Sequence, residues 1–124
     1  MELKYYVCEK CGNLVEMVEE SGMPMRCCGQ QMTEIKPGTE DAVIEKHVPA
    51  VSVDGCVVNV VIGEVEHPML EDHYIKWISI KTKQGSQRKT LKPGDAPKAC
   101  FVLCEGDELI KTYAYCNLHG LWEK

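Results

Sequence analysis

Eight cysteines in 124 residues constrain this chain more than any other feature of its sequence. Four of them form two pairs near the N-terminus, Cys8 with Cys11 in CEKCGN and Cys27 with Cys28 in RCCGQ. Cysteines of secreted proteins form disulfides, whereas a reducing cytosol favours metal or redox chemistry. Because MELKYYVCEK lacks the apolar core of a signal peptide, we expect a cytoplasmic protein that binds a metal.

The two cysteine pairs have the spacing of a four-sulfur metal site. A C-x2-C pair presents two thiolates from one tight turn, and a second pair completes a tetrahedral shell that suits zinc or iron. Cys27 and Cys28 are adjacent, so both can reach one metal only if the backbone turns there. A vicinal disulfide or a redox dithiol is the alternative. Residues 1–36 are also too few to bury much core without a metal or another staple.

The rest of the chain has the pattern of a β-rich domain. Pro37 and Gly38 mark a boundary, and beyond them short stretches rich in Val, Ile, Tyr and Trp are separated by turn sequences. The clearest stretches are residues 56–63, 73–81, 98–105 and 108–116. No stretch keeps a helical apolar period over three turns. The sequence predicts a mostly β chain, with a small metal-binding domain at 1–36 and an antiparallel, immunoglobulin-like sandwich at 37–124.

Charge and hydropathy exclude two classes of partner. The formal net charge is −5 and no basic stretch with interleaved aromatic residues occurs, so we expect no binding to nucleic acid or to an anionic membrane surface. The longest apolar runs are only a few residues, too short to span a bilayer.

The histidines suggest a second metal site. The chain has four, His47 in EKHVP, His67 before Pro68, His73 at the start of a predicted strand, and His119 three positions after Cys116 in YCNLHG. A lone histidine is more often a surface or core residue, and the spacing of this set leaves ordinary histidines and a mixed His/Cys metal site as equal alternatives. Four imidazoles and one thiolate exceed the four ligands of structural zinc and suit iron with a sixth position open. A thiolate opposite an open position donates electron density, which predicts a redox site.

The chain resembles desulfoferrodoxin, the two-iron form of superoxide reductase. The resemblance is carried in the family's order by YVCEKCGNLVE, RCCGQQM, EKHVP, HPM, HYIKWI, LKPGDAP and YCNLHG, nearly the whole chain. It implies a desulforedoxin-like domain at 1–36 whose iron is held by Cys8, Cys11, Cys27 and Cys28. It also implies a catalytic domain at 37–124 with a second iron, held in one plane by His47, His67, His73 and His119 and axially by Cys116.

The resemblance also implies an activity. Family members reduce superoxide to hydrogen peroxide with one external electron and two protons, usually accept the electron from rubredoxin, and are typically cytoplasmic homodimers. The position of Glu45 binds the ferric iron after turnover, and the position of Lys46 attracts superoxide and helps deliver a proton. Outside this motif, Glu45 and Lys46 would be interpreted as a solvated surface pair. This chain has Ala114 where the family often has an acidic residue, so any role of that carboxylate is in doubt here.

Two other functions are compatible with parts of the sequence. The chain could be an electron carrier of the rubredoxin or desulforedoxin type with the sandwich as a scaffold, or a structural zinc protein. The carrier hypothesis leaves the four histidines unexplained. Three cysteines have no assigned role, and their strand-like surroundings predict small buried hydrophobic residues: Cys56, Cys100 and Cys104.

Overall fold

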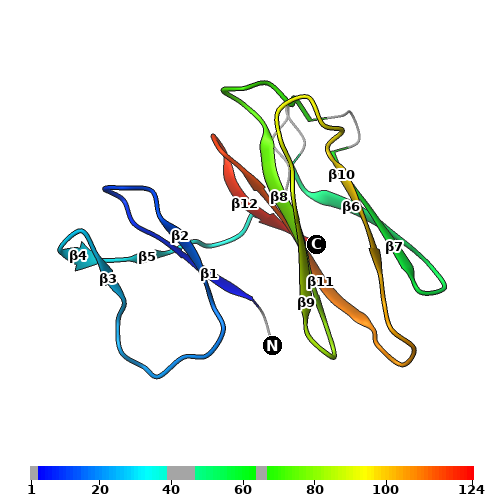
Figure 1. Cartoon of the computed structure of the whole chain (residues 1–124), viewed down its shortest axis with the longest axis horizontal. Coiled ribbons are helices and arrows are strands. Elements are labelled where there is room, and N and C mark those ends of the chain that lie inside the picture. The colour runs from blue at the N-terminus through cyan, green and yellow to red at the C-terminus, as the bar shows by residue number, and fades with distance from the viewer. Residues whose placement is uncertain (1–2, 39–46, 64–66) are drawn as a thin grey trace. The chain divides into compact units, whose positions relative to one another are not determined.

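The computed structural model describes residues 3–38, 47–63 and 67–124, which contain strands and turns but no helix. The chain divides into two compact units, Met1–Lys36 and Pro37–Lys124, called unit 1 and unit 2 below. Figure 1 shows the strands of each unit. The prediction of a mostly β chain is confirmed.

Unit 1 combines a three-stranded antiparallel sheet with a short hairpin. The sheet has the strand order β2-β1-β5 and consists of β1 (Lys4–Val7), β2 (Leu14–Met17) and β5 (Thr33–Glu34). The hairpin consists of β3 (Arg26–Cys27) and β4 (Gln30–Gln31). Among the described residues of unit 1, the buried apolar side chains are Tyr5, Cys8 and Met32. Such a small core cannot by itself offset the entropy of ordering the segment.

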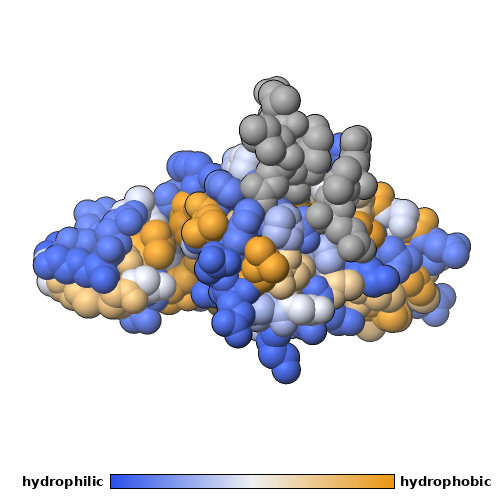
Figure 2. Space-filling view, turned by 90° about the horizontal axis from the view of Figure 1, so that it is seen from above, coloured by the Kyte–Doolittle hydropathy of each residue, from blue (hydrophilic) through white to orange (hydrophobic). Residues whose placement is uncertain are grey.

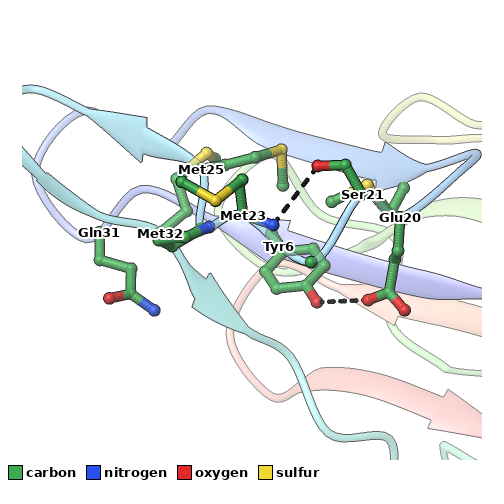
Figure 3. A pocket seen from close by; sticks show the side chains of 10 residues that line it. Tyr6, Glu20, Ser21, Met23, Met25, Gln31 and Met32 are labelled. Carbon is green, nitrogen blue, oxygen red and sulfur yellow. Dashed lines mark hydrogen bonds between the residues drawn. The ribbon is translucent and has the colours of Figure 1, made fainter.

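A pocket of about 370 Å³ in unit 1 is lined by ten residues, four of which are methionines (Figure 3). The Tyr6 hydroxyl donates a hydrogen bond to Glu20 at 3.2 Å, and the Lys4 ammonium lies 3.2 Å from the same carboxylate. Four thioether side chains share the wall: Met17, Met23, Met25 and Met32. Unbranched methionine side chains adapt to irregular space, which suits a unit with so little regular core.

Unit 2 is an antiparallel sandwich of two sheets (Figure 1). One sheet has the order β10-β7-β6 and consists of β6 (Pro49–Asp54), β7 (Val57–Ile62) and β10 (Lys98–Val102). The other has the order β12-β11-β8-β9 and consists of β8 (Ile75–Thr82), β9 (Ser86–Thr90), β11 (Leu109–Cys116) and β12 (Gly120–Glu123). The seven strands in the described part of unit 2 agree with the predicted immunoglobulin-like sandwich.

Alternate residues of the strands form the core between the two sheets. Val58, Val60 and Ile62 of β7 are fully buried, as are Ile78 and Ile80 of β8. This spacing follows from the period of two in a strand, which sends successive side chains to opposite faces. Each buried aliphatic side chain contributes about 1.5–3 kcal/mol, so the sandwich supports its own fold and can hold loops at its end in place.

Side chains from β9 cover the outer edge of β10. These two strands are edge strands of different sheets. The Gln87 amide donates to the Val102 carbonyl at 3.1 Å, and the Lys89 ammonium donates to the Cys100 carbonyl. Lys89 also lies 5.4 Å from the centre of the Phe101 ring. The two sheets are thus linked along this side by side-chain hydrogen bonds.

The prediction that the three unassigned cysteines are buried is wrong, because Cys56, Cys100 and Cys104 are all exposed. Phe101 and Leu103 point into the core, so the strand period turns Cys100 and Cys104 outward. Cys56 lies in the turn between β6 and β7.

The surface shown in Figure 2 has apolar residues scattered among hydrophilic ones. Within the described ranges, no helix has the length and apolar character needed to cross a membrane.

Candidate metal centres

Five side chains that could hold a metal ion meet at one end of the sandwich. Their ligand atoms all lie within 4.8 Å of one another, and the residues are His47, His67, His73, Cys116 and His119. The antiparallel pairing explains why they meet. Pro49 at the start of β6 pairs with Ile62 at the end of β7, and Ile75 at the start of β8 pairs with Cys116 at the end of β11. Segments that are distant in sequence therefore open onto the same end of unit 2.

The four imidazole rings form a closed square. Ring centroids are 4.7 Å apart for His47 and His67, and 4.9 Å for His67 and His73. The square closes with 5.1 Å between His73 and His119 and 4.9 Å between His119 and His47. Nε2 of His47 lies 3.2 Å from Nδ1 of His119. Adjacent nitrogens about 2.1 Å from one ion would lie about 3 Å apart, so the square fits a single transition-metal ion.

A hydrogen bond sets the tautomer of His67. Its Nδ1 lies 2.7 Å from the carbonyl oxygen of Pro68. Because a carbonyl only accepts, Nδ1 carries the proton and Nε2 is the nitrogen that can bind a metal. The Pro68 carbonyl thus holds this ring in one orientation.

Burial is uneven across this group. Cys116 is 0% exposed and belongs to the apolar core, while His47 and His67 are also buried. His73 is half-buried and His119 is exposed. Solvent therefore reaches the group from the side of His119, and the sulfur is shielded by apolar side chains. Five donors of this kind exceed a closed four-ligand zinc shell and suit an ion that takes more than four ligands, such as iron.

Asn117 joins two of the ligand-bearing segments, a role that the sequence analysis missed. Its side-chain oxygen accepts from the Tyr74 amide at 2.9 Å, and its side-chain nitrogen donates to the Asp72 carbonyl at 3.0 Å. Its backbone amide donates to the Tyr74 carbonyl at 3.2 Å. The turn after Cys116 is thereby fastened to the residues on both sides of His73. The signal available in the sequence was the position of Asn117 inside YCNLHG.

Replacing Asn117 by Ala is expected to destabilise unit 2 by about 1–3 kcal/mol, because one partly buried and one exposed side-chain hydrogen bond are lost. Thermal unfolding monitored by circular dichroism measures this change. Asn117→Asp tests the contact with Asp72 separately, since it keeps an acceptor for Tyr74 but replaces the donor by a charged acceptor that repels the Asp72 carbonyl. An unchanged melting temperature in Asn117→Ala would show that the side-chain hydrogen bonds of Asn117 contribute nothing to stability.

The four N-terminal cysteines form the second group. The ligand atoms of Cys8, Cys11, Cys27 and Cys28 also lie within 4.8 Å of one another. The first pair sits in a tight turn in which Gly12 donates to the Cys8 carbonyl at 2.8 Å. Gly12 has a φ of +82°, which a residue with a Cβ rarely adopts. The turn aims both sulfurs to one side.

Backbone geometry explains how two adjacent cysteines can serve one site. Cys28 has a φ of +54° and Gly29 a φ of +75° between the paired residues Cys27 and Gln30. Positive φ at both central residues is typical of a two-residue type I′ hairpin turn. The left-handed Cys28 redirects its side chain toward the sulfur of Cys27, 4.0 Å away. A disulfide bond is about 2 Å long, so the vicinal disulfide alternative does not fit.

The thiols of this group require a cation to ionise together. The amide of Cys11 donates to Cys8 and lowers the pKa of that thiol to about 6. Contacts with Cys11 and then Cys8 raise the pKa of Cys28 to about 12. Neighbouring anionic sulfurs repel each other, whereas a bound metal ion stabilises all four thiolates. Four sulfurs at these distances suit tetrahedral iron or zinc.

Other residues singled out from the sequence have different outcomes. Glu45 and Lys46 lie in residues 39–46, outside the described residues, so their roles stay predictions. Ala114 is fully buried in the core beside Ile78, its partner in β8.

Comparison with known proteins gives consistent matches. The sequence model described as Desulfoferrodoxin matches residues 39–124. The desulfoferrodoxin of Syntrophotalea carbinolica is 45% identical over 123 residues, covering 98% of this chain and 94% of that protein. The superoxide reductase of Treponema pallidum has a TM-score of 0.85 and 35% identity, covering 99% of this chain and 98% of that one. The superoxide reductase of Giardia intestinalis has a TM-score of 0.56 and 37% identity, covering 64% and 95%.

The Syntrophotalea and Treponema matches extend over both groups of ligands, whereas the sequence model covers the His/Cys group alone. The chain belongs to the desulfoferrodoxin family.

Proposed function

We propose that this protein is a superoxide reductase that binds two iron ions per chain. The observation that carries the proposal is the convergence of four imidazoles and one buried cysteine sulfur at the end of the sandwich. Residues 37–124 would be the catalytic domain and residues 1–36 the four-cysteine iron domain. The names of the Treponema and Giardia structural neighbours support the same activity.

The five donors of the site would have different roles. Iron bound there would supply the one electron that, with two protons, converts superoxide to hydrogen peroxide. His47, His67, His73 and His119 would hold the ion, with the ring of His67 fixed by its hydrogen bond to Pro68. Cys116 would be the fifth ligand, and burial keeps water from its sulfur. An anionic substrate would approach the position that these five residues do not fill.

Glu45 and Lys46 are proposed to act on that substrate side. The chain carries a net charge of −5, so an anion needs a local positive charge to be drawn in. One ammonium about 6 Å from superoxide contributes about 2–3 kcal/mol at an effective dielectric constant near 20. Lys46 would supply this attraction and help to protonate the product, and Glu45 would bind the oxidised ion after turnover.

The partners follow from the same proposal. Superoxide is the substrate, and a rubredoxin-like protein is the electron donor. The protein is proposed to act as a homodimer in the cytoplasm, without binding nucleic acid or membrane. The four-cysteine iron would serve as an electron relay or as structural support.

Metal content and product yield test the proposal together. Protein expressed with iron available is expected to be coloured and to contain close to two iron ions per chain, one for each ligand group. A reductase supplied with electrons forms as much peroxide as the superoxide it consumes, whereas a dismutase forms half as much. A colourless protein that contains zinc, or a peroxide yield of one half with release of oxygen, would contradict the proposal.

A further inference from the structure

The indole of Trp122 contacts two residues of the His/Cys group. It stacks on the ring of His47, with centroids 4.8 Å apart and an angle of 14° between the planes. Its Nε1 donates to the carbonyl oxygen of His119 at 3.1 Å. One side chain thus touches a ligand residue from the segment before β6 and another from the turn before β12. These two rings are neighbours in the imidazole square.

Gly38 leaves the space that the indole occupies. Its backbone pairs with β12, donating to the Leu121 carbonyl and accepting from the Glu123 amide, each at 2.9 Å. A Cβ built on Gly38 would lie 2.7 Å from Cε3 and from Cζ3 of Trp122. Real Cβ atoms do not approach other atoms this closely, and the hydrogen bonds to β12 restrict movement of the backbone. An alanine at this position would therefore push the indole out of place.

We infer that Trp122 is a positioning residue for the His/Cys metal centre, and that Gly38 gives the indole room to stack on His47. The inference rests on the proposed binding of iron by His47 and His119. It goes beyond the proposed function, because it assigns a role to an aromatic side chain that binds neither the ion nor the substrate.

The contacts give Trp122 two separable effects. The hydrogen bond to the His119 carbonyl fixes the turn that carries His119, so its loss lets that ligand drift and weakens metal binding. The stacked indole face carries negative charge density and favours an imidazole made electron-poor by a bound cation. The ferric ion withdraws more charge than the ferrous ion. Loss of the indole is therefore expected to raise the midpoint potential of this centre.

The test uses the full, iron-loaded chain and measures two properties other than activity. The first is the release of iron from the His/Cys site to a competing chelator, followed by its thiolate-to-iron absorption. The second is the midpoint potential of the same absorption band. Trp122→Leu removes both contacts and is expected to weaken iron binding about 10- to 100-fold, the usual effect of losing an outer-shell partner. Trp122→Phe keeps a stacking face and loses the N–H, so it should restore the potential and lose less than about tenfold in affinity.

Gly38→Ala tests whether Gly38 affects the metal centre through the indole of Trp122. In the wild-type background it should weaken iron binding and raise the potential, in the direction of Trp122→Leu. In the Trp122→Leu background the indole is already gone, so Gly38→Ala should change the affinity for iron by less than about twofold. Deviations of this size are usual when the effects of two independent substitutions are added. Equal effects of Gly38→Ala in the two backgrounds would overturn this part of the inference.

Two controls distinguish a specific effect on the His/Cys site from a general loss of structure. Trp77 also stacks on an aromatic ring, that of Tyr115 at 5.5 Å, so Trp77→Leu removes a similar side chain from the same unit. The four-cysteine iron in the same molecule should be released at the wild-type rate in every variant. If Trp122→Leu does not fold, Trp122→Phe and Gly38→Ala carry the test.

The outcomes separate the two proposals. If the wild type holds iron and reduces superoxide, but Trp122→Leu matches it in iron release and potential, only the role of Trp122 is overturned. If Trp122→Leu weakens a bound iron in a wild type that forms no peroxide, the positioning role stands and the proposed reaction fails. If the wild-type His/Cys site binds no iron, both fail.

Discussion

Replacing Cys116 by Ser is expected to lower the rate of superoxide reduction by more than about 100-fold, beyond the usual effect of losing an outer-shell partner of a metal. The thiolate is the only anionic donor in a group that otherwise offers four neutral imidazoles. A serine hydroxyl stays protonated at neutral pH and donates far less electron density. Stopped-flow mixing with superoxide, together with the peroxide yield, measures the loss.

The matched control is Cys104→Ser, which changes an exposed cysteine of the same unit. It should react at the wild-type rate. Cys116→Ser also places a hydroxyl in the apolar core, which costs about 1–3 kcal/mol if the hydroxyl is left without a partner. Circular dichroism at the assay temperature must therefore show that the variant is folded. A folded Cys116→Ser variant with the wild-type rate would refute the assignment of Cys116 as an axial ligand.

Loss of metal from the four-cysteine group is expected to unfold unit 1 and leave unit 2 intact. The described part of unit 1 buries only Tyr5, Cys8 and Met32 among its apolar side chains. Structural zinc contributes about 10–16 kcal/mol to the folding of small cysteine- and histidine-rich peptides. A contribution of this size decides whether 36 residues fold. Cys8→Ala removes both a ligand and a buried side chain, and hydrogen exchange measures the result.

In Cys8→Ala, amides of β1 should exchange at rates close to those of an unfolded chain, while amides of β7 and β8 stay protected. Cys56→Ala, which removes an exposed cysteine of unit 2, should leave both units protected. Protection of β1 in a Cys8→Ala variant that lacks iron would show that unit 1 folds without its metal. The same variant also separates the enzyme from the electron carrier, because an enzyme keeps its reaction with superoxide and a carrier loses its function.

The sequence was sufficient to predict the sandwich because its central strands are rich in β-branched and aromatic residues. The predicted stretches at 56–63, 98–105 and 108–116 contain β7, β10 and β11, and the stretch at 73–81 contains all of β8 except Thr82. The edge strand β9 has the sequence SQRKT, which carries no apolar alternation because both of its faces are largely exposed. A polar edge strand of this kind is defined by its hydrogen bonds to β8 and not by a pattern in its own residues.

The metal centres were likewise predictable from the sequence only in part. Residue type and spacing indicated both groups of donors as candidates, and the family resemblance supplied the complete ligand sets. Spacing did not reveal the left-handed conformation of Cys28, which is a property of the backbone dihedrals. Nor did it reveal the hydrogen bonds of Asn117, which join residues 43 to 45 positions apart. The error at Cys100 and Cys104 was avoidable, because Phe101 and Leu103 already define the inward face of that strand.

The side chains that reach from β9 to β10 have a consequence for self-association. An open edge strand presents unpaired backbone groups, and another chain can add a strand there, which leads to aggregation or to dimers with a continuous sheet. On β10, the carbonyls of Cys100 and Val102 already accept hydrogen bonds from Lys89 and Gln87. An incoming strand would have to displace an ammonium and an amide from these carbonyls. This edge is therefore protected against strand addition, and a dimer of this protein would form more readily through another surface.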